Sequence, residues 1–184
     1  MSANTSFVVV NDLTFDDPDE THVRKIKTST FRVMPRVAEP NEPMRANGPN
    51  TYWPTDSIWS VIFDGKDVRG LVACAYTLVT DDAEFLIFLN DEPMGTAMTI
   101  YRRSYRPRFP GNFSLSDHGT LVRAVPISDL WEKQQIPEMI TDHTPYWFSG
   151  GDFTFSPDNR TLIHKTRWGT ILQIDLATGV VKKS

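Results

Sequence analysis

The sequence is poor in cysteine and has no long hydrophobic segment. The single cysteine, Cys74, lies within the apolar run LVACAYTLV and cannot form an internal disulfide. A chain without disulfides is typical of a reducing compartment. No stretch approaches the roughly 18 apolar residues of a membrane span, and MSANTSFVVVNDLTFDD lacks the basic start and the long apolar core of a signal peptide. We therefore expect a cytoplasmic protein that does not enter a membrane.

Local motifs of common enzyme classes are also missing. The sequence has no G-x-x-x-x-G-K-[ST] or G-x-G-x-x-G phosphate loop, no H-E-x-x-H or C-x-x-C pair and no G-x-S-x-G turn. This excludes only the motif-bearing members of those classes. No two of the four histidines have the spacing of zinc ligands, and the acidic stretch NDLTFDDPDE, where calcium is conceivable, lacks the glycine and the alternate-position ligands of an EF-hand loop. We therefore expect neither a metal nor a cofactor. The net charge of -4 disfavours overall attraction to nucleic-acid phosphates.

The segments that are present favour β structure. With 40% hydrophobic and 11% aromatic residues, the 184-residue chain has an ordinary globular composition that suits sheets. Asp64-Gly65 is typical of a hairpin turn, and Asp81-Asp82 is a second turn signal. The turns separate apolar segments that predict a meander of four strands, with the second segment central: residues 58–63, 68–80, 84–89 and 96–105.

The N-terminal third is less regular. Residues 6–10 and 29–37 predict strands, and a polar turn cluster follows the first of them. Four prolines in residues 38–57 forbid regular structure and predict a linker, a surface arm or a binding loop. We divide the chain into an N-terminal part, residues 1–57, that packs on a β-meander domain, residues 58–184. Together they most simply form one domain.

The C-terminal third contains a well-marked sheet unit. Residues 152–181 predict four strands separated by three turns, and a short helix capped by Ser128 is expected to end before Pro137. FSLSDHGTLVRA, from Phe113, aligns with FTFSPDNRTLIHK, from Phe153, if DHG is a turn. The two segments begin 40 residues apart, which is within the period of roughly 40–45 residues of propeller blades.

Residues 155–179 resemble one blade of WD-repeat or quinoprotein-type β-propellers. The resemblance rests on FSPDN, on Gly169-Thr170-Ile171 before a strand and on DLATG at the end; the Gly-His and Trp-Asp pairs of WD repeats are missing. It implies loops that contact partners and no particular chemistry. We expect a mainly β fold of antiparallel meanders, packed as an open propeller-like stack or a β-sandwich, with one short helix.

Two charged segments are candidate partner-binding sites. NDLTFDDPDE offers a carboxylate cluster for a basic partner, and YRRSYRPRF interleaves arginine with aromatic rings, as protein hot spots and nucleic-acid stacking sites do. Internal ion pairs at a strand end are the alternative for the second segment. Trp53, between prolines, is either an anchor or a core residue, whereas Trp147 and its neighbours suit the core. The candidate residues are Asp16, Asp17, Asp19, Glu20, Trp53, Arg102, Arg103, Tyr105, Arg106 and Arg108.

The histidines leave a catalytic alternative open. Asp117-His118 and Asp142-His143 could each form a base and the group that orients it. Solvated turn histidines are the simpler interpretation, and His164 is expected on the surface of the sheet unit.

The sequence thus favours a non-catalytic protein-binding module. A concrete version is a bacterial immunity protein that blocks a toxin domain by direct binding. The alternatives are a hydrolase that uses one of the Asp-His pairs, or a single-stranded nucleic-acid binder through residues 101–109; nucleic acid is the less expected partner.

Overall fold

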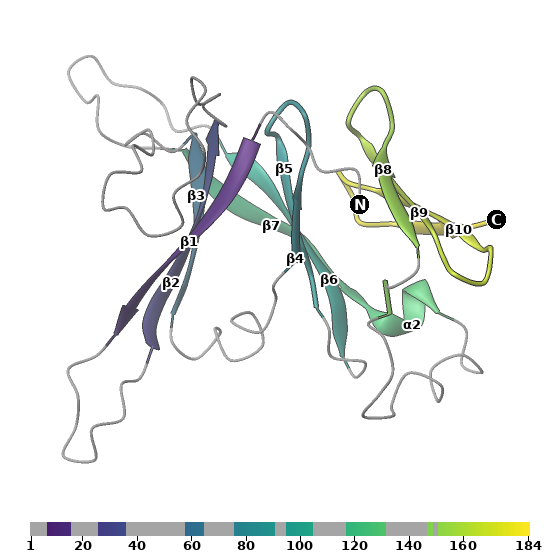
Figure 1. The fold of residues 1–184 in the computed structure, drawn as a ribbon, viewed down its shortest axis with the longest axis horizontal. Helices are drawn as coiled ribbons and strands as arrows, with labels where there is room; N and C mark the ends of the chain where they lie inside the picture. The colour runs from purple at the N-terminus through teal and green to yellow at the C-terminus, as the bar shows by residue number, and fades with distance from the viewer. Residues whose placement is uncertain are drawn as a thin grey trace, which may run out of the picture.

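The fold is mainly β, as the sequence predicts. The computed structural model describes residues 7–15, 26–35, 58–64, 76–90, 95–104, 117–131, 147–148 and 151–184. These residues form eleven strands in two sheets and one short helix (Figure 1).

The first sheet curls into a nearly closed barrel. Its order is β1-β2-β3-β7-β6-β5-β4, and β1 at one edge contacts β4 at the other. Neighbouring strands are antiparallel except β3 and β7, which are parallel where Trp59 pairs with Asp117 and Ser60 with His118. The strands are β1 (Phe7–Phe15), β2 (Ile26–Pro35), β3 (Trp59–Asp64), β4 (Tyr76–Val79), β5 (Phe85–Leu89), β6 (Thr96–Ser104) and β7 (Asp117–Pro126).

Aromatic side chains fill the barrel. Phe31, Phe63, Phe88 and Tyr101 come from four different strands and contact one another edge to face, with ring centroids 4.7 to 5.8 Å apart. Edge-to-face pairs add to the free energy gained by burying the rings. This interior cluster therefore links β2, β3, β5 and β6 across the sheet.

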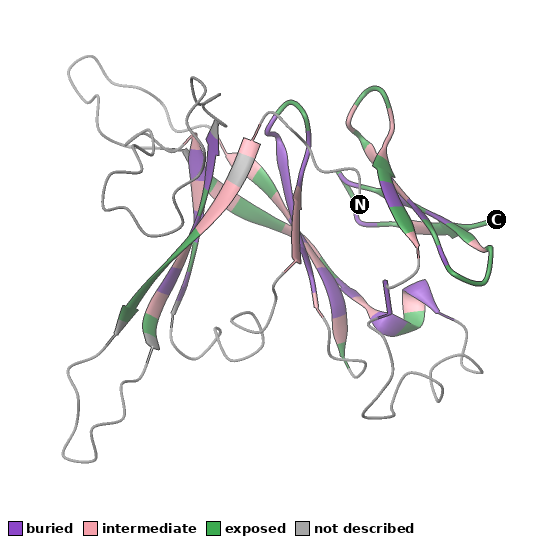
Figure 2. Ribbon diagram, in the orientation of Figure 1, coloured by how far each residue is buried: buried purple, intermediate pink, exposed green. Residues whose placement is uncertain are grey.

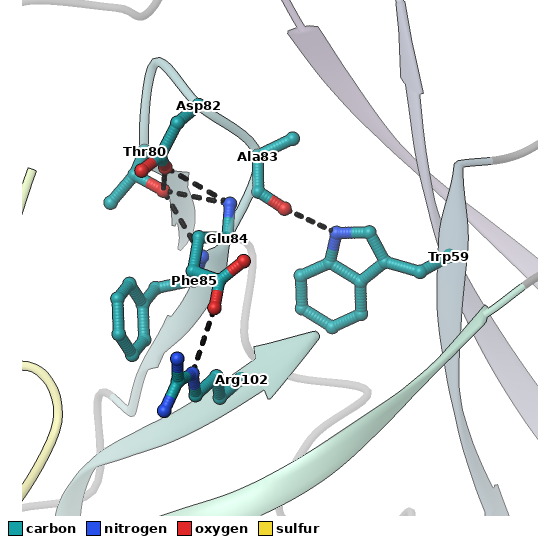
Figure 3. A network of polar contacts seen from close by, with 7 residues as sticks. All are labelled: Trp59, Thr80, Asp82, Ala83, Glu84, Phe85 and Arg102. Atoms are coloured by element: carbon teal, nitrogen blue, oxygen red, sulfur yellow. Dashed lines mark hydrogen bonds and ion pairs between the residues drawn. The ribbon is translucent and has the colours of Figure 1, made fainter. Parts of the chain in front are cut away.

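Trp59 anchors the barrel to the turn between β4 and β5. Its side chain is fully buried, and its indole Nε1–H donates to the Ala83 carbonyl oxygen at 2.7 Å (Figure 3). The turn itself is held by Thr80, whose Oγ1 accepts hydrogen bonds from the backbone N–H groups of Glu84 and Phe85. A polar indole edge is thus satisfied within an apolar interior.

Gly119 makes room for Trp59 inside the barrel. A Cβ added at Gly119 would lie 2.4 Å from Val61 Cγ2 and 2.7 Å from Trp59 Cζ3. We predict that Gly119→Ala lowers the free energy of unfolding by about 2 kcal/mol, because overpacking forces neighbouring side chains from their rotamers. Chemical denaturation measures the effect, with Ala124→Gly as a control for the glycine–alanine difference in the same strand. An unchanged stability would show that β7 is not this close to β3.

The second sheet is a four-stranded antiparallel meander, which confirms the unit predicted for residues 152–181. Its order is β11-β10-β9-β8, and its strands are β8 (Asp152–Phe155), β9 (Thr161–Lys165), β10 (Ile171–Asp175) and β11 (Val181–Lys183). Leu172, Ile174 and Leu176 are completely buried, as their alternation predicts.

The turn residues act as the sequence predicts. Asn159 adopts the left-handed conformation, with φ of 58°. Asp158 Oδ1 accepts hydrogen bonds from the Ser156 hydroxyl and the Arg160 backbone N–H, at 2.5 and 3.1 Å. Asparagine is common in turns because it tolerates the left-handed conformation, and aspartate because its side chain accepts hydrogen bonds from nearby backbone N–H groups.

The second sheet packs against the outside of the barrel. Every residue of β5 is buried, because successive side chains of a strand point to opposite faces. Leu86 and Phe88 belong to the interior cluster, whereas Phe85, Ile87 and Leu89 pack with the buried face of the second sheet. Figure 2 shows β5 and parts of the second sheet in purple, the colour of buried residues. The strand β5 therefore contributes side chains to both hydrophobic cores.

Arg123 ties the two sheets together from β7. Its Nη1 donates to the Gly179 carbonyl oxygen at 2.7 Å, and its Nη2 pairs with Asp129 Oδ2 at 2.5 Å. Gly179 has φ of 71°, and a Cβ there would lie 2.6 Å from the Arg123 side chain. Asp129 belongs to the short helix α2 (Ile127–Leu130), which adjoins β7. One guanidinium thus joins the barrel, the helix and the last turn.

Several local predictions are wrong. Asp117, His118 and Gly119 lie in β7 rather than in a turn, so the segment from Phe113 and the unit from Phe153 do not share this turn and contribute to different sheets. Asp64-Gly65 does not join β3 to β4 as neighbours, since β3 lies between β2 and β7. The segment expected to be central contributes β4, which lies at the end of the strand order. Gly119 favours a turn by composition, but here it permits close approach of a neighbouring indole.

The ends of two elements also differ from the prediction. β1 continues to Phe15 through residues assigned to a polar turn, because it pairs with β2 over its whole length. Ser128 does not cap the helix: the N-cap is Pro126, and the helix ends before Trp131, whose backbone is extended. The predicted proline-rich arm and Cys74 lie outside the described residues.

Candidate binding pocket beside the second sheet

Most of the predicted partner-binding residues lie outside the described part of the chain. These are Asp16, Asp17, Asp19, Glu20, Trp53, Tyr105, Arg106 and Arg108. Arg102 and Arg103 are described, at the end of β6. Asp12, in the same acidic segment, lies on β1 and forms an ion pair of 2.8 Å with Arg32 of β2. The grouping of the predicted residues into one surface stays a prediction.

Arg102 has partners within the protein. Its Nε donates to Glu84 Oε1 at 2.8 Å, and its guanidinium lies 5.8 Å from the centroid of the Phe85 ring (Figure 3). The Glu84 side chain is only 10% exposed, so its charge is compensated mainly within the fold. The ion-pair alternative for this strand end therefore describes Arg102, although half of its side chain remains exposed to other contacts.

His164 is buried, so its predicted surface position is wrong. Its ring stacks on Phe153 with centroids 4.1 Å apart and meets Trp147 edge-on. The Nδ1 lies 3.2 Å from the Asp152 carbonyl oxygen, and this hydrogen bond requires the proton on Nδ1. The Nε2 has no hydrogen-bond partner among the described residues. The histidine faces the core because alternation on β9 places it there with Leu162.

The buried histidine predicts a loss of stability in mild acid. Burial lowers the pKa of His164 below its usual 6.5, although the hydrogen bond to Asp152 and the charge of Asp152 oppose this shift. Below pH 6.5 the unfolded chain therefore binds a proton that the folded chain does not. The free energy of unfolding consequently decreases as the pH is lowered through this range. This pH range lies well above pH 3.8, near which the Asp158 carboxyl group titrates in the unfolded chain.

His164→Phe should flatten this dependence, since the ring stack is kept and the titration removed. Denaturant unfolding of both proteins from pH 7 down to pH 5 measures it, with His118→Phe, at an exposed histidine, as the control. Equal slopes in the wild type and in His164→Phe would contradict the assignment.

A pocket lies where α2 meets the second sheet. Leu130 and Trp131 form its helix side, and the turn between β9 and β10 forms another side with Thr166, Trp168 and Thr170. Lys183 of β11 and Ser184 complete the lining, and the volume is about 280 Å³. Backbone bonds fix the walls: Thr166 and Thr170 close the turn, and Ile171 pairs with Ser184 in both directions.

Two tryptophans define the pocket. The rings of Trp131 and Trp168 meet edge to face with centroids 4.2 Å apart. Trp131 is buried, whereas Trp168 is 37% exposed, and the Arg167 guanidinium lies 3.9 Å from the centroid of the Trp168 ring. Gly169, with φ of 89°, provides the backbone conformation that this turn needs after Trp168. The turn thus presents a large aromatic ring at the surface.

Two buried polar atoms of the pocket's residues lack partners. Within the described residues, neither the Trp131 Nε1–H nor the Thr166 hydroxyl forms a hydrogen bond. Both atoms are covered in this structure, so a ligand would reach them only if a lining side chain such as Trp168 moved. A buried donor without an acceptor is costly, and such groups are rare in folded proteins. These atoms are the strongest sign of an interaction that the described part of the chain does not complete.

Sequence reasoning missed this pocket. Trp131 was assigned to the predicted helix, and Trp168 lay within the blade-like segment without a predicted role. Gly169, which follows Trp168, is the signal that could have placed this tryptophan at a turn. The meeting of the two rings depends on the packing of α2 beside the second sheet, for which there is no local signal.

Comparison of the chain with protein-family models, with curated proteins and with solved structures found no match. Within the described ranges, no three potential metal ligands gather into a group. The helix of these ranges, α2, has four residues and is too short to cross a membrane.

Proposed function

We propose that the protein is a non-catalytic protein-binding module whose partner docks on the Trp131–Trp168 pocket. The observation that supports this most is an exposed tryptophan beside two residues, Trp131 and Thr166, that line the same recess and whose buried polar groups have no partner among the described residues. Tryptophan is enriched among the residues that dominate protein interfaces. A partner that covered Trp168 would bury its exposed ring, and an acceptor from the partner would complete the hydrogen bonds of the unsatisfied groups.

The resemblance to a propeller blade stays part of this proposal. The second sheet has the four antiparallel strands of a blade, and its β9–β10 turn carries Trp168. Blades of WD-repeat and quinoprotein-type propellers present such turns to partners. In the proposal this turn serves the same purpose beside the barrel.

The specific form that we propose is a cytoplasmic bacterial immunity protein that blocks a toxin by direct binding. A small, mildly acidic chain suits this class. A toxin-like reading frame directly upstream of the gene would support it. The direct test is co-expression with the product of that frame: the chain should restore growth, and Trp168→Ala should restore it less. Full rescue by Trp168→Ala would remove the pocket from the interaction.

Binding itself is tested with the purified chain. We expect a stoichiometric complex with one protein of the native host, no turnover, and a weakened complex for Trp168→Ala. Ile62→Ala is the matched control, since Ile62 is 67% exposed on β3 of the barrel. Isothermal titration with the purified partner measures both variants. An equal loss of affinity in both, or in neither, would contradict docking at the pocket.

A further inference from the structure

We infer that the Trp131–Trp168 pocket accepts a carboxylate, carried by a glutamate or aspartate side chain of the partner. This inference rests on the proposed function and specifies the partner's chemistry. It follows from three properties of the pocket: the polarity of its unsatisfied groups, the charge around it and its size.

The unsatisfied groups require an acceptor. An indole N–H can only donate, so the group that completes Trp131 must accept a hydrogen bond. The Thr166 hydroxyl can donate as well. Both groups belong to residues that line the pocket, and a ligand reaches them once a lining side chain such as Trp168 moves aside. Two donors then match the two oxygens of a carboxylate, whereas a single amide carbonyl provides one oxygen.

The charge around the pocket favours an anion. Lys183 lines the pocket, and no aspartate or glutamate side chain does. In the part of the chain that the structure describes, Lys183 has no ion pair. Lys182, which precedes Lys183 on β11, lines a different recess, whereas the Arg167 guanidinium lies against the Trp168 ring beside the pocket. Lys183 and Arg167 therefore place positive charge at the pocket, although the chain as a whole carries a net charge of -4. Hydrogen bonds to an ionised acceptor are roughly twice as strong as neutral ones.

The size and lining fit one side chain. A volume of about 280 Å³ is at the lower limit of small-molecule pockets, which span roughly 300–1,000 Å³. Leu130 and the two indole rings provide apolar contact for the methylene groups of a glutamate. The recess is therefore suited to a single residue inserted from a protein surface.

The test uses the indole N–H signals in a nitrogen-15 correlation spectrum, in which Trp131→Phe assigns the Trp131 signal. The full chain is titrated with the capped pentapeptides acetyl-AAEAA-amide and acetyl-AAQAA-amide, which differ only in charge and acceptor. Sodium acetate is a third ligand at matched ionic strength. We expect saturable movement of the Trp131 signal with the glutamate peptide, at an affinity about tenfold above that of the glutamine peptide.

Two variants test the residues involved. Lys183→Met should lower the affinity for the glutamate peptide several-fold, because the cation is lost and the stem is kept. Thr166→Val should lower it without loss of stability, because it removes a hydroxyl that has no partner in the described ranges. Lys165→Met, at the exposed last position of β9 and outside the pocket lining, is the matched control and should bind as the wild type does.

The inference is overturned if both peptides move the Trp131 signal at equal affinity, if the signal does not move, or if Lys183→Met binds unchanged. Acetate that binds as tightly as the glutamate peptide would assign the site to small anions in place of a partner's side chain. The proposed function fails separately. If the partner complex survives Lys183→Met and Thr166→Val but is lost in Trp168→Ala, the protein is a binding module that docks at the pocket, and the inference of a carboxylate ligand is wrong.

Discussion

Trp59→Ala should lower the free energy of unfolding by about 4 kcal/mol, in the range measured for buried tryptophans. The side chain is fully buried in the barrel and packs where Gly119 of β7 leaves it room. Its loss would open a cavity between β3 and β7 and leave the Ala83 carbonyl without its indole donor. Equilibrium denaturation followed by circular dichroism measures the change.

Two variants show which part of the effect is packing. Trp59→Phe keeps most of the apolar ring and removes the hydrogen bond, so we expect a smaller loss, of about 2 kcal/mol. Ile62→Ala, at an exposed position of the same strand, should change stability by less than about 0.5 kcal/mol. A Trp59→Ala loss below that of Ile62→Ala would be incompatible with a barrel filled from β3.

Trp147→Ala should destabilise the junction between the barrel and the second sheet by a similar amount, about 4 kcal/mol. Trp147 is 2% exposed, contacts Phe148, Phe153 and His164 edge-on, and donates from Nε1 to the Asn90 carbonyl oxygen at 2.6 Å. Asn90 follows β5, whereas Phe153 and His164 belong to the second sheet. Removing the ring therefore weakens both sides of the shared core at once.

Trp168→Ala is the matched control for Trp147→Ala. Both remove an indole, but Trp168 is 37% exposed and lies at a turn. We expect Trp168→Ala to cost less than about 1 kcal/mol and to leave the tertiary structure unchanged. If the two substitutions cost the same, the second sheet would not share a core with β5 through Trp147.

The strands and turns of the second sheet were predictable because their signals are local. Alternation placed Leu172 and Ile174 on one face, and the turn preferences of Asp158, Asn159 and Gly179 appear in the structure. The predicted core position of Trp147 is also confirmed. In each case residues close in sequence determine the structure.

The barrel was not predictable in the same way. The parallel pairing of β3 with β7 joins residues far apart in sequence, and no local pattern encodes it. Gly119 was assigned to a turn because composition cannot distinguish a turn glycine from one that makes room for an indole. His164 was placed on the wrong face because a polar side chain was assumed to face solvent, whereas strand alternation placed it in the core.

Only the residue types of the candidate site were predictable from the sequence, not its position. Aromatic and basic residues were expected at a partner surface, but Arg102 is engaged with Glu84. The pocket instead combines Trp131, Trp168 and Lys183, which come from three separate elements. Their proximity depends on how the second sheet packs beside α2, and sequence patterns do not report that packing.

Position-specific photo-crosslinking tests most directly whether the pocket face is the docking surface. Purified chains carry p-benzoylphenylalanine either at Arg167, beside Trp168, or at Ile62 on the barrel, and each is irradiated with extract of the native host. Docking at the pocket predicts one discrete crosslinked protein from position 167, suppressed by excess unlabelled wild type and not by Trp168→Ala, and none from position 62. The same product from position 62 alone, or none from position 167, would contradict it.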